Sequence, residues 1–185
     1  TVVANGGVSG FHAGRRFGFE QAATSPSAAL TDPEIDAVVI ATRHDSHASL
    51  VCEALAAGKH VFVEKPLAID RDGLSDIESL YGKLAQEGRH PLLAVGFNRR
   101  FSPHARSMRG LLEGVAAPKV VSVTVNAGVI AAEHWTQDRE SGGGRLIGEA
   151  CHFVDLLRYL VGVPIAGVET TNLRTREGVA LEDSA

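Results

Sequence analysis

Short apolar runs alternate with amphipathic segments through the first half of the chain. The apolar runs predict β-strands at Thr1–Asn5, Asp36–Ala41, His60–Val63 and Pro91–Phe97. Helical periodicity, ended each time by a glycine, predicts helices at Ser9–Phe17 (with Ser9 as N-cap), His47–Ala57 and Asp72–Glu87. The second of these strands is apolar throughout, as expected of a strand covered on both faces. Strands and helices that alternate at this spacing predict an α/β fold with a parallel sheet.

The pattern changes near residue 98. The elements predicted beyond it are a helix at Pro103–Glu113, a long strand at Lys119–Val129, a helix at Leu146–Leu160 and a strand at Gly167–Leu173. Longer strands beside helices indicate an α+β domain with an open, largely antiparallel sheet. We therefore expect two incomplete domains, residues 1–98 and 99–185.

Composition excludes several classes of protein. The 185 residues include 18 Lys and Arg against 22 Asp and Glu, a formal charge of −4, which argues against a nucleic-acid partner. The apolar runs are too short to span a bilayer, and no signal segment opens the chain, so no membrane partner is expected. Two cysteines, Cys52 and Cys151, make no disulfide framework, which favours a cytoplasmic protein.

The ends of the chain are unusual. It begins at Thr1, inside a predicted strand and without an initiator Met, and it stops at Ala185 without a closing element. We therefore expect a piece of a longer protein.

The strongest local signal is the segment His60–Leu67. Glu64 and Lys65 come where a buried strand ends, and in parallel sheets ligands bind at the carboxyl ends of strands. A lysine placed there can transfer protons, and Pro66 can hold a cis peptide that fixes the turn. A surface Glu/Lys pair before a turn proline is the alternative.

A second signal follows the strand that ends at Ala41. Thr42 and Ser46 bring hydroxyls to the start of a helix, an arrangement that favours an anion such as a phosphate. Simple helix capping by Asp45 or Ser46 is the alternative. A metal site at His44 and His47 would need a further ligand.

The segment Gly142–Asp155 is the third signal. On a helix Gly148, His152 and Asp155 share one face, and Glu149 also lies beside His152. A histidine near a carboxylate can act as an acid or base, although a satisfied core histidine gives the same pattern.

The fourth signal, Asn98–Phe101, follows another strand end. Arg99 and Arg100 could clamp an anion or stack on a planar ring, or they could simply be solvated at a domain junction.

Together these motifs resemble the Gfo/Idh/MocA family of nicotinamide-dependent oxidoreductases. The pieces that match are Val39–Thr42 with His47, Glu64–Pro66, Gly96–Phe101 and the His152–Asp155 helix segment, and they span nearly the whole chain. The run from Asn126 to His152 is most similar to a subgroup fused behind a zinc-alcohol-dehydrogenase-like region. The resemblance implies a Rossmann domain followed by an α/β domain whose sheet covers the active site.

The resemblance also implies roles for individual residues. Lys65, His152 and Glu149 would be catalytic, with Lys65 beside the substrate carbinol and His152 as its acid/base partner. The substrate would contact Lys65, Asp155, His152 and Trp135. NAD or NADP would lie against Asn5, Ala41, Thr42, His44, His47, Glu64, Lys65, Arg99 and Arg100.

Two departures from the family pattern change this expectation. Many members carry an aspartate four residues before the helix histidine, where this chain has Gly148, and Glu149 is the possible substitute. The chain also lacks a G-x-G-x-x-G loop. We therefore assign Thr1–Asn5 to the second Rossmann strand, with the first βα unit missing. No acidic residue ends that strand, and Arg15 and Arg16 follow it, so the choice between NAD and NADP stays open.

Three functions follow as hypotheses. The leading one is a dehydrogenase acting on a sugar, nucleotide sugar or cyclitol, which would be a homo-oligomer joined through its C-terminal sheet. The second is a binding or assembly module that keeps the fold without catalysis. The third, a zinc hydrolase using His44, His47 and His134, has the least support, and we expect no metal.

Overall fold

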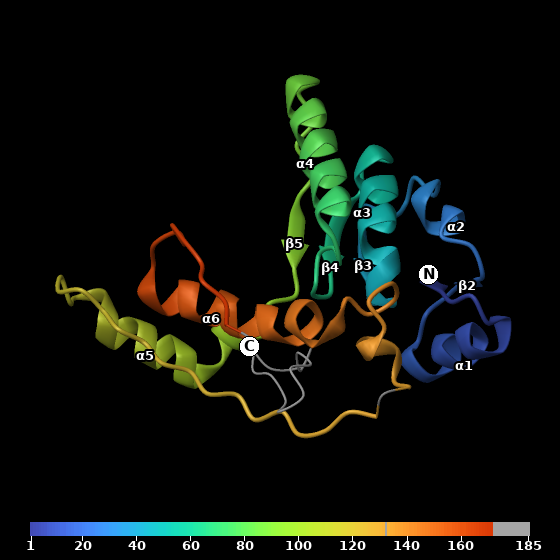
Figure 1. The fold of residues 1–185 in the computed structure, drawn as a ribbon. Coiled ribbons are helices and arrows are strands. Elements are labelled where there is room, and N and C mark those ends of the chain that lie inside the picture. The colour runs from blue at the N-terminus through green and yellow to red at the C-terminus, as the bar shows by residue number, and fades with distance from the viewer. Residues whose placement is uncertain (132, 172–185) are drawn as a thin grey trace. The chain divides into compact units, whose positions relative to one another are not determined.

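The computed structural model describes residues 1–131 and 133–171, which form two compact units (Figure 1). The first unit comprises Thr1–Thr42, Ser46–Glu64 and Arg71–Val95. The second comprises Arg43–Asp45, Lys65–Asp70 and the described residues from Gly96 onward. The chain leaves the first unit just after Thr42, Glu64 and Val95, close to three of the strand ends that the sequence analysis singled out.

The first unit contains two groups of parallel strands. β1 (Val2–Val3) pairs with β2 (Ala22–Ala23), and β3 (Ala37–Ile40), β4 (His60–Val63) and β5 (Leu93–Val95) form a three-stranded sheet in that order. Val61 of β4 stands opposite Val38 on one side and Leu93 on the other. The predicted α/β class and parallel sheet are therefore confirmed.

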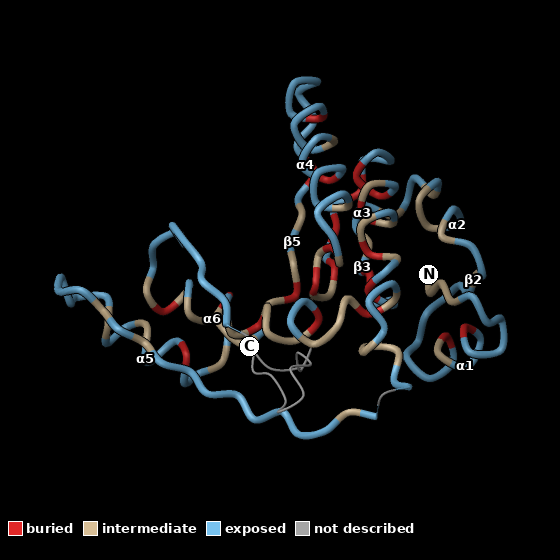
Figure 2. The backbone as a smooth tube through the Cα atoms, in the orientation of Figure 1, coloured by how far each residue is buried: buried red, intermediate tan, exposed pale blue. Residues whose placement is uncertain are grey.

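Four helices connect these strands: α1 (Gly7–Phe17), α2 (Ser27–Leu30), α3 (His47–Ala56) and α4 (Arg71–Gln86). α3 packs against α4, β3 and β4, and buried residues follow its length (Figure 2). The apolar core of this unit consists of Ile40, Val51, Ala54, Leu55, Val61, Val63, Ile77 and Leu84. This burial fixes the carboxyl ends of β3 and β4, from which the candidate residues follow.

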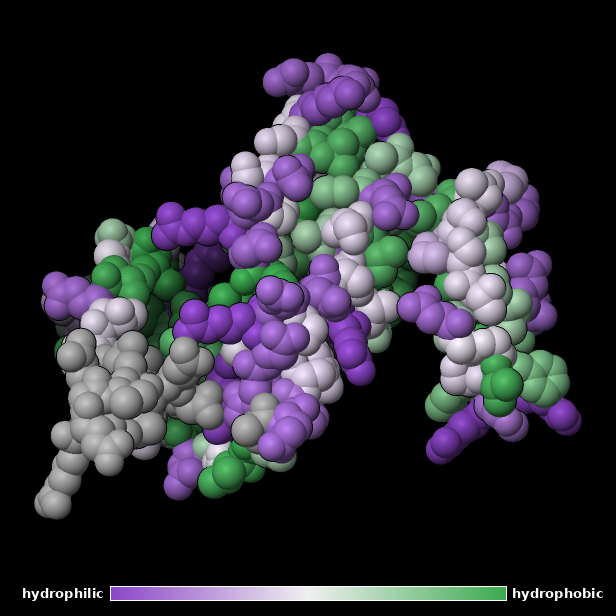
Figure 3. All heavy atoms as spheres, turned by 45° about the vertical axis from the view of Figure 1, so that its right-hand side comes forward, coloured by the Kyte–Doolittle hydropathy of each residue, from purple (hydrophilic) through white to green (hydrophobic). Residues whose placement is uncertain are grey.

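Two expectations for the first unit need correction. α1 begins at Gly7 with Gly6 as its N-cap, so Ser9 lies inside the first turn, where its hydroxyl donates to the Gly6 carbonyl instead of capping the helix. β3 is not covered on both faces, since Val39 is 73% exposed. Hydrophobic side chains also reach the surface elsewhere, as Figure 3 shows, and on α1 they include Phe11 and Phe17.

The second unit is built from helices and turns. α5 (Pro103–Glu113) packs against α6 (Cys151–Val161), and a 3-10 turn, Asn98–Phe101, leads into α5. The Ser102 hydroxyl caps α5 by accepting from the Ala105 N–H at 3.2 Å. The Arg109 guanidinium donates to the carbonyls of Tyr159 and Leu160, which satisfies the last turn of α6.

The long strand predicted at Lys119–Val129 is not present. These residues are extended but irregular, and Val120 and Val129 are 98% and 99% exposed. Residues 167–171 likewise form no strand, and the rest of the second predicted strand lies outside the described residues. A strand needs a neighbour to accept its hydrogen bonds, and the described part of the second unit supplies none.

The helix predicted at Leu146–Leu160 has a wider first turn than expected. Leu146–Ala150 form a π-helical turn, and the α-helical part, α6, starts at Cys151. Single π turns inside helices occur often at functional sites. None of the helices described is both long and apolar enough to cross a membrane.

Candidate active site

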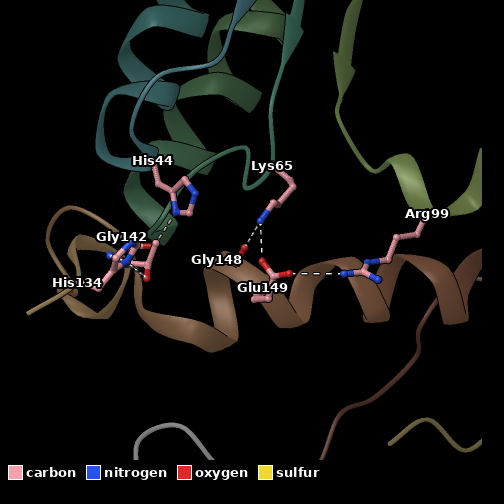
Figure 4. A network of polar contacts seen from close by, with 8 residues as sticks. His44, Lys65, Arg99, His134, Gly142, Gly148 and Glu149 are labelled. Atoms are coloured by element: carbon pink, nitrogen blue, oxygen red, sulfur yellow. Dashed lines mark hydrogen bonds and ion pairs between the residues drawn. The ribbon is translucent and has the colours of Figure 1, made fainter. Parts of the chain in front are cut away.

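Lys65 lies at the centre of the candidate site. It follows the end of β4 in the sequence and belongs to the second unit. A cis peptide joins it to Pro66, as the sequence suggested. Its ammonium donates to the Gly148 carbonyl at 2.6 Å and to Glu149 Oε2 at 2.9 Å (Figure 4). Only 16% of the side chain is exposed. The π turn before α6 therefore holds the lysine through one backbone and one side-chain acceptor.

Glu149 lies between two cations. Its second oxygen, Oε1, is 3.5 Å from the Arg99 guanidinium, on the side away from Lys65 (Figure 4). Burial alone would raise the pKa of this carboxyl. The hydrogen bond and charge of Lys65, with the charges of His152 and Arg99, outweigh burial and lower the pKa below its ordinary value. Position 148 is glycine in this chain, and the carboxylate that contacts Lys65 comes from the next residue, Glu149.

Arg99 is held by an aromatic ring as well as by charge. Its guanidinium lies over the Phe153 ring, 4.4 Å from the centroid. Its Nε is buried and donates to no acceptor among the described residues. Because a buried donor without an acceptor is costly, this atom suits a polar ligand group.

His152 lies on the buried face of α6. The ring is 7% exposed and meets Phe97 edge to face, with 6.3 Å between centroids. Gly148 and Asp155 are buried as well, so the shared face expected for these three residues is confirmed. The charge of His152 acts on Glu149, which ties the histidine to the lysine cluster electrostatically.

Arg100 and Asp155 form a bidentate ion pair. Arg100 Nε donates to Asp155 Oδ2 at 2.9 Å, and the second amino group reaches Oδ1. The hydrogen bond to Asp155 raises the pKa of Arg100, although burial opposes this. The structure thus pairs Arg100, which the sequence analysis expected at the cofactor, with Asp155, which it expected at the substrate.

His44 belongs to the second unit and is buried there. Its Nδ1 donates to the Gly142 carbonyl at 2.8 Å. The Trp135 ring packs edge to face against the His44 ring, with 4.8 Å between the ring centroids. The Arg43 guanidinium lies 5.7 Å from the Trp135 ring centroid. A carbon placed on Gly148 would come within 3.1 Å of His44 Cε1. His44 and Trp135 therefore form one cluster with the turn that holds Lys65.

The remaining predicted cofactor residues lie in the first unit. Thr42 and Ser46 share a hydroxyl–hydroxyl hydrogen bond of 2.6 Å, so Ser46 does not cap α3 with its side chain. His47 is fully buried, and its Nε2 donates to the Thr42 carbonyl at 3.2 Å. Glu64 follows β4, and its N–H donates to Ile40. The other two residues, Asn5 and Ala41, follow β1 and β3.

Sequence reasoning missed some parts of the candidate site, chiefly backbone groups. The carbonyls of Gly142 and Gly148 accept from His44 and Lys65, and no side-chain pattern could reveal them. Phe153, which supports Arg99, carried a detectable signal, because it is adjacent to His152 in the same motif.

Neither cysteine nor metal chemistry is supported by the described residues. Burial raises the pKa of the Cys151 thiol, which disfavours the thiolate needed for nucleophilic attack. Among residues 1–131 and 133–171, no three His, Cys, Asp or Glu side chains are grouped as a metal would require.

Comparison with known proteins places these features in a family. Residues 5–97 match the model of an oxidoreductase family with an NAD-binding Rossmann fold, and residues 116–184 match the C-terminal α/β domain of the same family. The chain is 32% identical to levoglucosan dehydrogenase of Pseudarthrobacter phenanthrenivorans over 161 residues, which is 81% of this chain and 39% of that protein. It is 32% identical to scyllo-inositol 2-dehydrogenase (NAD(+)) of Bacillus subtilis over 157 residues, which is 83% of this chain and 43% of that protein.

Solved structures agree with this placement. Levoglucosan dehydrogenase in complex with NADH and levoglucosan matches with a TM-score of 0.68 and 30% identity, over 86% of this chain and 44% of that one. The chain thus spans less than half the length of these relatives. With both domain models matched in order, the chain belongs to the Gfo/Idh/MocA oxidoreductase family.

Proposed function

We propose that the chain is part of an NAD(P)-dependent dehydrogenase that oxidises a hydroxyl of a sugar, nucleotide sugar or cyclitol. The observation that carries this proposal is the Lys65 ammonium held between the Gly148 carbonyl and the Glu149 carboxylate. The relatives act on levoglucosan and scyllo-inositol by name, which supports a small polyhydroxylated substrate.

Oxidation of a carbinol requires the protein to orient the hydroxyl and remove its proton. Lys65 is fixed at its ammonium, so it can donate a hydrogen bond to the substrate oxygen and stabilise charge on that oxygen. His152 is the group that takes the hydroxyl proton as general base. Glu149 holds the Lys65 ammonium in place through its hydrogen bond, the task that an aspartate at position 148 would otherwise share.

A nicotinamide cofactor, when bound, supplies the hydride acceptor. The residues that would hold it are Thr42, His47 and Glu64 at the strand ends, and Arg99, whose buried Nε fits a ligand acceptor. Arg15 and Arg16 lie in the last turn of α1, where each stacks on a phenylalanine ring. They favour NADP if the adenosine ribose lies near Asn5, whereas the Bacillus subtilis relative is by name an NAD(+) enzyme, which favours NAD.

Turnover and cofactor binding test this proposal together. Fluorescence titration of the full-length protein with NADH and NADPH gives the cofactor, and a panel of levoglucosan, inositols and a nucleotide sugar gives the substrate class. Lys65→Ala should lower kcat by about 10²–10⁴-fold with little change in cofactor affinity. Lys83→Ala, an exposed lysine on α4, is the matched control. Unchanged turnover in Lys65→Ala would refute the role of Lys65.

A non-catalytic binding or assembly module remains the second proposal, because Gly148 replaces the usual acidic residue. It predicts that neither dinucleotide binds and that no polyol is oxidised. Homo-oligomerisation through the second domain and a cytoplasmic location accompany either proposal. Exposed valines at 120, 123, 125 and 129 support such an association surface. The domain boundary near residue 98 stays a prediction.

A further inference from the structure

His44 fills the space that a side chain at position 148 would take. A Cβ at Gly148 would lie 3.1 Å from His44 Cε1, 3.3 Å from the Gly142 oxygen and 3.4 Å from His44 Nδ1. Real Cβ atoms rarely have neighbours this close, so a side chain at 148 would require the His44 ring or the Gly142 carbonyl to move by a few tenths of an ångström. The His44 ring therefore restricts what position 148 can carry.

His44 has little room to yield. Its Nδ1 is bonded to the Gly142 carbonyl at 2.8 Å, and the Trp135 ring packs on it at 4.8 Å. The neighbouring Asp45 N–H donates to the Ser141 carbonyl at 3.2 Å, which ties the same two segments together a second time. Gly142 is fixed too, because a Cβ there would lie 2.5 Å from the Thr136 backbone.

The other side of the same turn holds the lysine. The Gly148 carbonyl accepts from Lys65 at 2.6 Å, and the next residue, Glu149, supplies the second acceptor at 2.9 Å. His44 therefore lies between the Trp135 ring and the place that a Cβ of Gly148 would occupy, and the Gly148 carbonyl binds Lys65. Figure 4 shows His44, Gly148 and Lys65 in this arrangement.

We propose that His44 is a positioning residue: by packing against Gly148 it sets the π turn so that the Gly148 carbonyl and Glu149 hold the Lys65 ammonium. The sequence analysis expected His44 to contact the cofactor. In this proposal His44 instead acts on Lys65 through the turn at Gly148. The proposal rests on the assigned importance of Lys65, but its test uses neither cofactor nor turnover, so the two can fail separately.

The test measures the reactivity of the Lys65 amine. The chain has four lysines, 59, 65, 83 and 119, so mass spectrometry after brief acylation resolves each one. The rate at Lys65 is divided by the rate at exposed Lys83 in the same sample. Gly148→Ala should raise this ratio several-fold, because the added methyl displaces the turn and releases the ammonium.

The decisive variant is the double substitution. His44→Ala alone should also raise the ratio. The double variant His44→Ala with Gly148→Ala should raise the ratio by less than the two single effects combined, because the methyl then occupies the space that His44 has vacated. His44→Asn, which keeps a donor for the Gly142 carbonyl but leaves the Cε1 position empty, should likewise tolerate Gly148→Ala. Circular dichroism checks folding in each case.

Two results would overturn the proposal. One is a Lys65 ratio that stays at the wild-type value in folded Gly148→Ala. The other is a double variant in which the rise in the Lys65 ratio, or the loss of folding, equals the two single effects added together. If Gly148→Ala fails to fold while the double variant folds, the result would support the proposal that residues 44 and 148 compete for the same space, because the two variants differ only at position 44.

Discussion

The two units are stabilised in different ways. The first unit buries aliphatic side chains between α3, α4 and a parallel sheet, with Leu55, Val51 and Val63 fully buried. In the described part of the second unit the buried apolar residues are Ala68, Ala105 and Leu160, and they are matched by buried His44, His152 and Asp155. The first unit also buries His47 and Lys59, but its core is mainly aliphatic, whereas polar groups that must stay paired make up a larger share of the second core. The same polar groups form the candidate site.

The comparison can be tested most strongly in the first core. Leu55→Ala removes a fully buried side chain and should lower the free energy of unfolding by about 2–5 kcal/mol. Urea unfolding followed by circular dichroism measures the loss. The matched control is Leu111→Ala, at a leucine that is 79% exposed on α5, with an expected change within about 0.5 kcal/mol. Equal losses would show that burial does not distinguish these sites.

The corresponding test in the second unit is its partly buried ion pair. Asp155→Asn leaves Arg100 without a carboxylate and should cost about 1.5–3 kcal/mol, the range for hydrogen bonds to charged groups. Trp135 is the single tryptophan and lies in this unit, so its fluorescence reports the transition. Glu113→Gln removes an exposed partner of Arg109, 3.7 Å away, and should cost less than about 1 kcal/mol. A silent Asp155→Asn would contradict the polar account of this unit.

A glycine pair sharpens the comparison inside the second unit. Gly162 ends α6 with φ of +82°, and a Cβ there would collide with the Arg109 guanidinium. Gly162→Ala should therefore destabilise by about 1–2 kcal/mol. Gly110→Ala, inside α5 with open space around it, should stabilise by about 0.5–1 kcal/mol. Thermal melts of the two variants should shift in opposite directions, and a shift in the same direction would contradict this reasoning.

The smallest expected effect is the pH dependence contributed by Glu149. Its pKa is lower in the folded state than the ordinary 4.5, so the folded state binds fewer protons. The stabilisation is present above the ordinary value and is lost as the pH falls through the lower, folded value. Unfolding of wild type and Glu149→Gln across this acidic range measures it, and the variant should show the shallower slope. Identical slopes would mean that Lys65 does not stabilise the carboxylate.

The sequence predicts the first unit better than the second for a physical reason. In the first unit β4 has the predicted bounds, and α3 and α4 are displaced by at most one residue at each end, because local periodicity and glycine stops determine them. In the second unit the helix α5 also has its predicted bounds, and the error lies in the strands. The strand at Lys119–Val129 fails because a strand depends on a distant partner that alternation does not encode.

The candidate site shows the same division. Lys65, Glu149 and His152 could be chosen from their motifs, and the structure brings Lys65 to Glu149. The acceptors on Gly142 and Gly148, and the pairing of Arg100 with Asp155, depend on backbone position and long-range packing. Residue type alone carries no signal for them.

The extended valine-rich segment also has a consequence for handling the protein. Residues 120–125 make no backbone hydrogen bond to other described residues, and they carry exposed valines at positions 120, 123 and 125. An unpaired extended edge of this kind is a template on which further strands add, which is the first step of aggregation. Solubility at high concentration is therefore the property that a charged substitution such as Val123→Lys would improve first.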